Sequence, residues 1–493
     1  MQGNTDTVVI RGGAVITVDN DRRILDPGTI VVEGDRIVSV DKPARIEAEY
    51  EPDIEIDASD SVLLPGLIDS HGHAGHALTK GLGVGSEGGW MNAVQDVYFH
   101  SSTEEFWQAE SYLAALEHLE MGVTTSLSFP GSSPRVDDPK YSIAASTGYA
   151  DLGLRHIVNV GPPNPPYPKS YTDGATGTEQ SADLDDAIAT TATVIDELDG
   201  AENGRLSVYV GPSGLVPEFV EDGERKPAGL VGDSFVFCDG EPSEMSVRQL
   251  EQVVELADAK GTKIHTHAFG GQVKAAAEAV PEVLSPDLSL AHCSALTSEE
   301  LELMAEHGVS ASHGPLTHAY ARARFPLVEA LDAGVNVAVS TDGAAPDRSF
   351  DLLSQGRIAA QLQRAHCNDT SLLPYGKIIE MMTIDAAKAL GMADEIGSLE
   401  PGKKADVIGI SLESAKLRPR TALSHRIAHY ASGADTDFVM VDGNVLVRES
   451  KFDSVDVESI LSEADRVTSE TFERAGVMDR LDGSPNAWHE TRF

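Results

Sequence analysis

Residues 62–76 read VLLPGLIDSHGHAGH, an apolar run over 62–68 followed by three histidines, His71, His73 and His76. Residues i and i+2 of a strand share a face, so His71 and His73 can both point at one ion. Imidazole is a common ligand of Zn²⁺, but a chain with 16 histidines also contains such pairs by chance. The stretch alone indicates either a metal site or a polar turn after a buried strand, and the rest of the chain decides between them.

The middle of the chain alternates short apolar runs with amphipathic stretches. Helices are expected over 103–122, 245–261 and 297–309, each with a glycine at or next to its end, as is typical of helix C-termini. The expected strands are 62–71, 123–129, 155–161, 205–212, 262–267, 288–294, 309–314 and 335–343. Eight strands that alternate with helices over about 330 residues predict an α/β fold, a (β/α)8 TIM barrel.

Both ends of the chain are rich in β-branched residues. Strands are expected within 7–19, 28–41, 403–412 and 437–449, with tight turns at 33–35 and 442–444. Two β-rich segments around a long middle predict one small β-sandwich domain assembled from both chain ends. The predicted division is 1–64 and 397–449 for the two parts of the sandwich, 65–396 for the barrel and 450–493 for a helical tail.

The net charge of the chain limits the classes of partner that it is expected to bind. Asp and Glu number 79 against 37 Lys and Arg, which gives a net charge of −42 and a pI near 4.6. Such a field repels phosphate backbones and anionic membranes, so nucleic acid and membrane are excluded as expected partners and a small-molecule substrate is favoured. Acids spread along the whole chain resemble the surfaces of proteins from salt-loving organisms. An ordinary acidic cytosolic enzyme is the alternative.

Three features favour a cytoplasmic chain. The three cysteines form no CxxC pair and cannot make a disulfide framework. The first residues, MQGNTDTVVIRGG, lack the basic and apolar regions of a signal peptide. No apolar run approaches the eighteen or so residues that a membrane span requires.

Polar residues stand at the carboxyl ends of the expected barrel strands, where they converge on one pocket. The set is His71 and His73, His265 and His267, His292, His313, and Asp342, at the ends of the first, fifth, sixth, seventh and eighth strands. Imidazoles and a carboxylate suit Zn²⁺ or Fe²⁺ with an open position for water. A bound divalent ion lowers the pKa of that water and makes hydroxide available. This joint placement favours the metal site over the polar turn.

At this point the chain resembles the amidohydrolase superfamily, and within it the mononuclear branch of cytosine-deaminase-like and chlorohydrolase-like enzymes. The resemblance runs from about residue 5 to residue 449. It is carried by PGLIDSHGHAGH, HTHAFG, LAHCSALTSEEL, SHGPLTH, VAVSTDGAAPDRSFDLL and GSLEPGKKADVIGI.

The resemblance implies a ligand set and roles. His71, His73, His267 and Asp342 would bind one divalent ion, Zn²⁺ first and Fe²⁺ as the alternative. Asp342 would also act as general base, and His292 would polarise the substrate or stabilise developing charge. The binuclear branch uses a lysine after the fourth strand, and RLSVYVGPSGL has none, so one metal is expected. Family members associate, which implies a homo-oligomer, a dimer or larger.

Two positions depart from the family pattern. The glutamate expected three residues beyond His267 is Gly270, so the proton donor of the family's deaminases is missing. A histidine expected after the fourth strand is replaced within 211–214, where Ser213 is the polar candidate. Substitute donors or substrate-binding residues are expected among His76, Trp90, His265, His313, His318, Arg322 and Arg324. For each of these residues a purely structural role is the alternative.

The sequence therefore predicts a metal-dependent amidohydrolase that cleaves a C–N or C–Cl bond of an amino- or halo-substituted nitrogen heterocycle. One alternative is a nucleobase or nucleoside deaminase with a different proton donor. Another is a metal-free relative kept for binding or as a scaffold.

Overall fold

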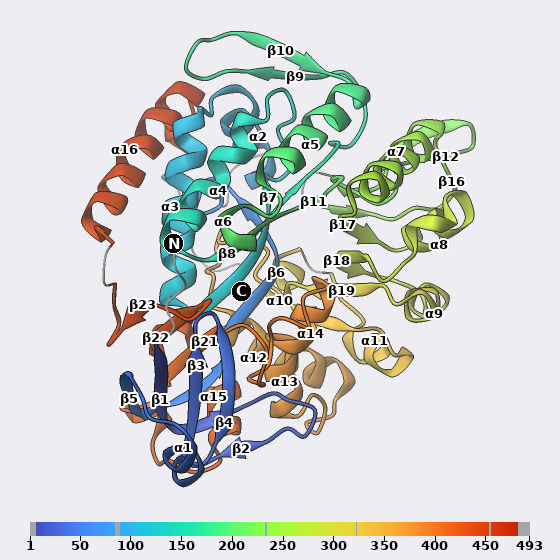
Figure 1. Cartoon of the computed structure of the whole chain (residues 1–493). Coiled ribbons are helices and arrows are strands. Elements are labelled where there is room, and N and C mark those ends of the chain that lie inside the picture. The colour runs from blue at the N-terminus through green and yellow to red at the C-terminus, as the bar shows by residue number, and fades with distance from the viewer. Residues whose placement is uncertain (1–5, 84–88, 232–233, 322, 453–454, 482–493) are drawn as a thin grey trace, which may run out of the picture.

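The computed structural model describes residues 6–83, 89–231, 234–321, 323–452 and 455–481 (Figure 1). Its centre is a parallel eight-stranded sheet that closes into a barrel, as predicted. The strands follow one another in chain order: β6 (Leu67–Ala74), β7 (Val123–Pro130), β8 (Arg155–Val160), β11 (Leu206–Val210), β17 (Ile264–Phe269), β18 (Leu288–Ser294), β19 (Ser310–His313) and β20 (Val337–Val339). Their residues are almost all buried, because helices cover the outside and side chains fill the inside.

The first and last barrel strands meet just beyond the end of β20. The backbone N–H of Asp342 donates to the carbonyl of His71 (3.0 Å), and the N–H of Thr341 donates to the carboxylate of Asp69 (2.9 Å). These bonds close the barrel between two segments about 270 residues apart in the chain. They also bring the predicted ligands at 71 and 342 to the same place.

The predicted helices form with the expected ends. They are α3 (Glu104–Glu120), α7 (Glu244–Lys260) and α9 (Ser298–His307), and the side chains of Thr103, Ser243 and Thr297 cap their first turns. Gly261 and Gly308 take left-handed conformations (φ 65° and 71°) that stop α7 and α9. The remaining helices are α1 (Pro43–Glu49), α2 (Gly89–His100), α4 (Lys140–Leu152), α5 (Leu184–Leu198), α6 (Ala201–Gly204), α8 (Gln272–Ala279), α10 (Pro315–Tyr320), α11 (Leu327–Ala333), α12 (Leu352–Cys367), α13 (Tyr375–Met381), α14 (Ile384–Ala389) and α15 (Leu423–Tyr430).

The two ends of the chain form one mixed sheet beside the barrel, which confirms the composite domain. Its strands are β1 (Thr7–Ile16), β2 (Ile24–Leu25), β3 (Gly28–Glu33), β4 (Arg36–Asp41), β5 (Ile54–Pro65), β21 (Val407–Ser411), β22 (Thr436–Val441), β23 (Asn444–Arg448) and β24 (Lys451–Phe452). The N-terminal and C-terminal parts join where β5 pairs antiparallel with β21. The turns predicted at 33–35 and 442–444 connect β3 to β4 and β22 to β23. Apolar side chains from both parts share one core.

The stretch 62–71, expected as a single strand, is divided between the two sheets. β5 ends at Pro65 against β21, and β6 begins at Leu67 against β7. Proline has no N–H to continue the ladder. Gly66 lies so close to the side chain of Thr124 that any Cβ at this position would overlap it. The chain therefore changes sheets at Gly66, five residues before the first histidine.

Long insertions follow two of the barrel strands. The Pro-rich segment after β8 carries the hairpin of β9 (Lys169–Thr172) and β10 (Glu179–Ala182), visible at the top of Figure 1. The segment after β11 carries β12 (Glu218–Glu221), β13 (Glu224–Pro227), β14 (Gly229–Val231), β15 (Ser234–Val236) and β16 (Glu241–Pro242). The tail forms α16 (Val457–Ala475), which packs against α3 and α2. Over the described ranges, no helix is long and apolar enough to cross a membrane.

Candidate metal centre

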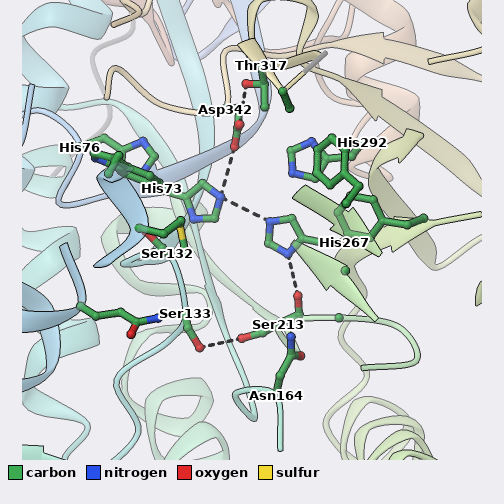
Figure 2. Close-up of a pocket in the computed structure, with 18 of the residues that line it drawn as sticks. His73, His76, Ser132, Ser133, Asn164, Ser213, His267, His292, Thr317 and Asp342 are labelled. Atoms are coloured by element: carbon green, nitrogen blue, oxygen red, sulfur yellow. Dashed lines mark hydrogen bonds and ion pairs between the residues drawn. The ribbon is translucent and has the colours of Figure 1, made fainter. Parts of the chain in front are cut away.

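Four predicted ligands converge at the carboxyl end of the barrel. His71 and His73 come from β6, His267 from β17, and Asp342 follows β20 (Figure 2 labels the last three). Asp342 Oδ1 lies 3.1 Å from His71 Nε2 and 3.2 Å from His73 Nε2, and His267 Nε2 lies 3.3 Å from His73 Nε2. Two sets of three ligand atoms each lie within 4.8 Å of one another, and they share His71: one is His71, His73 and Asp342, and the other is His71, His267 and His292. Either set is close enough to hold one cation.

The other ring nitrogens of these histidines are held from behind. His73 Nδ1 donates to the carbonyl of Gly131 (2.7 Å), and His267 Nδ1 donates to the carbonyl of Ser213 (2.9 Å). His71 Nδ1 lies 2.9 Å from His265 Nε2. A carbonyl accepts only from an N–H, so it fixes the tautomer that leaves the lone pair of Nε2 facing the centre. This is the arrangement expected of histidines that bind a divalent metal.

The protonation states also suit a metal. Burial lowers the pKa of His267 to about 3 and that of His71 well below its usual range, so both imidazoles are neutral and able to bind. Burial acts to raise the pKa of Asp342, but the guanidinium of Arg348 and the imidazole of His292 outweigh it and hold the pKa well below the usual range. Imidazoles and a carboxylate are a donor set that Zn²⁺ and Fe²⁺ both accept.

The second oxygen of Asp342 has partners that the sequence did not indicate. Oδ2 accepts a hydrogen bond from the hydroxyl of Thr317 (2.6 Å), and that hydroxyl accepts from Arg348 Nη1 (2.7 Å). Arg348 Nη1 lies 3.6 Å from Oδ2 itself, and the side chain of Arg348 is 4% exposed. Thr317 and Arg348 therefore fix the orientation of the carboxylate whose other oxygen faces the histidines.

A cavity opens directly above this centre. His73, His267, His292 and Asp342 line its inner end. Its lining combines aromatic residues, which include Trp90, Phe99, Phe235 and Phe269, with polar residues, which include Ser132, Ser133, Asn164, Lys169 and Ser213. Figure 2 shows Asn164 beyond Ser213 as seen from the histidines, so these two polar residues lead away from the centre. The shape suits a flat ring with a polar substituent.

His292 occupies the position expected of a residue that contacts the substrate. Its ring stacks on that of His267 (centroids 5.1 Å apart) and on that of Phe269 (5.5 Å). Its Nδ1 has no hydrogen-bond partner among the described residues. The backbone of His292 has φ 66°, and its carbonyl lies 3.0 Å from Nε2 of His318. The ring is thus placed by packing, with a nitrogen left for a ligand.

Three other predicted residues line the cavity. The ring of His76 stacks on that of His73 (5.0 Å) and contacts Trp90 edge to face (4.9 Å). Both ring nitrogens of His76 and the indole N–H of Trp90 lack partners in the part of the chain that the structure describes. The hydroxyl of Ser213 lies 2.9 Å from that of Ser133.

The remaining predicted substrate residues lie away from the cavity lining. His265 lies behind His71 and bonds Ser289 (2.6 Å), and His313 stacks on Phe325 (4.7 Å). His318 is within hydrogen-bond distance of the carbonyls of Gly314 and His292 and the hydroxyl of Ser294. The guanidinium of Arg324 forms an ion pair with Glu329 (2.7 Å), which balances its charge. These positions support a structural role for the four residues. Arg322 lies outside the described residues.

Gly270 leaves no room for the missing glutamate. A Cβ at this position would lie 2.6 Å from the carbonyl oxygen of Ala295. The N–H and carbonyl of Gly270 bond Ser294 (2.9 Å) and Cys238 (3.0 Å). Asp342 is the only carboxylic acid among the described residues that line the cavity. No other carboxylic acid in the described lining therefore replaces the family's proton-donating glutamate.

Glu110 of α3 supports the segment that follows the histidines. It is fully buried, and its carboxylate accepts the backbone N–H groups of Ala77 (3.0 Å) and Leu78 (2.8 Å). Burial raises the pKa of Glu110 to about 7 despite these bonds. The folded protein therefore binds a proton at this site at a pH where the unfolded chain has lost it.

The raised pKa gives the stability a defined pH dependence. Because the pKa of Glu110 is higher in the folded protein than in the unfolded chain, proton binding at Glu110 stabilises the folded state. This stabilisation is complete below the pKa of the unfolded chain and is lost as the pH rises through about 7. The free energy of unfolding of the wild type, relative to that of Glu110→Gln, should fall by about 2 kcal/mol between pH 5 and pH 8. Denaturant unfolding of both proteins at several pH values measures the difference. Glu104→Gln, an exposed position on the same helix, should follow the wild type, and a pH-independent difference for Glu110→Gln would contradict the prediction.

Comparisons with known proteins agree with this geometry. The model described as "Amidohydrolase family" matches residues 62–446. A 5-methylthioadenosine/S-adenosylhomocysteine deaminase of Moorella thermoacetica is 28% identical over 85% of this chain and 89% of its own length. An S-triazine hydrolase of Gordonia rubripertincta is 28% identical over 90% of each chain.

Solved structures show the same fold. An adenosine deaminase from Xanthomonas campestris with bound zinc has a TM-score of 0.77 at 22% identity, covering 94% of this chain and 98% of its own. An atrazine chlorohydrolase from Arthrobacter aurescens complexed with zinc has a TM-score of 0.70 at 22% identity, covering 94% of this chain and 100% of its own. At this identity the likeness is one of architecture.

Proposed function

The chain belongs to the amidohydrolase family, whose model matches residues 62–446, and from that premise we propose the reaction of this particular site. It hydrolyses a C–N or C–Cl bond at an sp² carbon of an amino- or halo-substituted nitrogen heterocycle. One observation carries the proposal: ligand atoms of His71, His73, His267 and Asp342 lie 3.1 to 3.3 Å from one another in successive pairs, at a cavity that aromatic residues help to line. The relatives named deaminase and triazine hydrolase act on rings of this kind.

These four residues would hold one divalent cation, Zn²⁺ by preference and Fe²⁺ as the alternative. When bound, the cation supplies Lewis acidity and lowers the pKa of water at the centre. The donor set fits, since the imidazoles of His71 and His267 are neutral, the outer nitrogens of His73 and His267 are hydrogen-bonded to carbonyls, and the carboxylate is ionised. The end of β11 offers no lysine for a second ion.

Side chains around the centre carry out the other steps of the proposed reaction. Asp342 takes the proton of the attacking water, with Thr317 and Arg348 holding its carboxylate in place. His292, stacked beside the centre with a free ring nitrogen, supports the negative charge that develops on the ring. Phe269 and Trp90 exclude water and accept the flat faces of the substrate.

The cavity favours a leaving group that departs without strong acid catalysis. Gly270 removes the family glutamate, and the described lining holds no second carboxylic acid. Chloride leaves as an anion without prior protonation, whereas an amine or ammonia leaves only after its nitrogen has gained a proton. The proton that Asp342 takes from the attacking water can supply this nitrogen, but loss of ammonia from a purine also needs a proton on the ring. The nucleoside-deaminase alternative therefore requires another donor, for which His76 is placed with both ring nitrogens unpaired.

A single preparation tests the proposal. Protein purified at high salt without a nickel column is assayed for metal by elemental analysis and then for release of ammonia, amine and chloride from triazines, pyrimidines and purine nucleosides. About one zinc or iron per chain, together with turnover of at least one ring, is the expected result. Absence of bound metal, even after reconstitution with zinc, would reject the hydrolase and favour the metal-free binding relative.

We also propose that the protein is adapted to high salt. Its 79 acidic residues outnumber its 37 basic residues, so the excess negative charges repel one another in dilute buffer. Its melting temperature should rise by more than about 5 °C between dilute buffer and molar KCl. Sucrose at matched osmolarity is the non-ionic control and should reproduce little of the rise. Equal melting temperatures in dilute buffer and KCl would contradict the adaptation.

The expected setting of the enzyme is part of the same proposal. We propose a cytoplasmic homo-oligomer, a dimer or larger, that acts on a small molecule and binds neither nucleic acid nor membrane. Cys238, Cys293 and Cys367 are all free thiols, as suits a reducing compartment.

A further inference from the structure

Lys169 is exceptional among the lysines of this acidic chain. It lines the cavity and is partly buried, yet its ammonium group has no ion pair or hydrogen bond with any described residue. The other described lysines without an acidic partner, Lys42 and Lys451, are exposed. Burial lowers the pKa of Lys169, and no neighbouring acid offsets that effect. In a chain with 79 acids, a cation held apart from all of them and facing a cavity requires a reason.

The backbone holds Lys169 at the cavity wall. It is the first residue of β9, two positions before Tyr171, so the two side chains share one face of the strand. Tyr171 is fully buried, and its ring packs edge to face on Phe99 of α2 (5.5 Å), which also lines the cavity. Pairing with β10 fixes the rest of the strand. The position of Lys169 is therefore set by the hairpin and not by an interaction of its ammonium group.

Other polar groups of the cavity lining also lack partners. The amide oxygen of Asn164 and the hydroxyl of Ser132 have no hydrogen-bond partner in the described chain. Trp90, which is 8% exposed and also lines the cavity, leaves its indole N–H unpaired. The second cation of the lining, Arg348, is already committed to Thr317 and Asp342. Lys169 is thus the one charge in the described lining that a ligand can take up.

We propose that Lys169 binds a carboxylate carried by the substrate, on the side of the heterocycle away from the bond that is cleaved. A single ammonium group balances one negative charge, and the net charge of −42 disfavours a doubly charged phosphate. Asn164, which also lines the cavity and lies beyond Ser213 as seen from the histidines (Figure 2), adds an amide N–H donor. The inference rests on the proposed hydrolysis and narrows its substrates to heterocycles with an acidic substituent.

A matched pair of ligands tests the subsite without requiring turnover. The ligands are a carboxyalkyl-substituted aminotriazine without a leaving group and its methyl ester, and binding to the metal-loaded protein is measured by calorimetry. The wild type should bind the carboxylate roughly tenfold more tightly than the ester. Lys169→Met should bring this ratio close to one, Lys169→Arg should retain most of it, and the exposed Lys451→Met should match the wild type.

The outcomes separate this inference from the proposed reaction. A wild-type ratio near one, or a preference for the carboxylate that persists in Lys169→Met, would overturn the subsite even if the enzyme hydrolyses neutral rings. Tighter binding of a phosphate analogue than of the carboxylate would also reject the assignment. Binding that follows the expected pattern in a protein without hydrolytic activity would retain the subsite and reject the reaction. With an active enzyme, the same ratio is expected in KM for hydrolysable versions of the two ligands.

Discussion

Asp342→Asn is expected to lower kcat by about three orders of magnitude, because the amide cannot accept a proton from water. In the wild type, Oδ1 of this residue faces His71 and His73, while Oδ2 accepts from Thr317 and lies 3.6 Å from Arg348. Asparagine has nearly the same shape, so the loss should exceed what a change in packing alone would cause. The measurement is kcat for the best substrate found in the panel, with metal content and melting temperature determined on the same sample.

Asp347→Asn is the matched control for this substitution. Asp347 lies on the same loop and is exposed, so the identical chemical change there should leave kcat within about twofold of the wild type. If Asp342→Asn instead retained more than a tenth of the activity, another group would be the base. Unchanged melting temperature would show that the loss is not one of folding.

His267→Ala is expected to abolish metal binding. Its Nε2 is one of four converging atoms, and the methyl group that replaces the ring offers no ligand atom. Three remaining ligands from β6 and the loop after β20 would leave one side of the site open to the cavity. We expect the metal content to fall from about one per chain to a small fraction after dialysis against a metal buffer, with activity lost in parallel.

Two histidines provide graded comparisons. His307→Ala removes an exposed imidazole at the end of α9 and should leave the metal content unchanged. His265→Ala removes the partner of His71 Nδ1 and should weaken metal affinity by roughly 10- to 100-fold without abolishing it. If His267→Ala bound metal as tightly as the wild type, the proposed ligand set would be incorrect.

Much of the architecture follows from local patterns. The apolar runs and capped helices predict the barrel because the residue pattern within each segment indicates whether it forms a strand or a helix. Parallel strands then place their carboxyl ends at the same end of the barrel. The stretch 62–71 was misjudged for a physical reason. Its apolar residues are buried in both sheets, so hydrophobicity does not mark the switch, and only Pro65 and Gly66 indicate it.

The centre was less completely predictable. His265 and His267 are both on one face of β17, so strand periodicity alone does not separate them. The family resemblance selects His267, and in the structure His267 lines the cavity whereas His265 lies behind His71. Thr317 and Arg348 were missed because their partner, Asp342, lies on a different segment, and spacing along the chain does not encode such contacts.

The closure of the barrel at Asp342 has a consequence for how the enzyme matures. The histidines of β6 leave the ribosome about 270 residues before the aspartate that completes the set, and β5 meets its partner β21 later still. During that interval the nascent chain holds two exposed imidazoles and an unpaired strand edge. If the predicted ligand set holds the cation, we expect loading only after translation has passed residue 342, because metal encountered earlier would find an incomplete set of ligands.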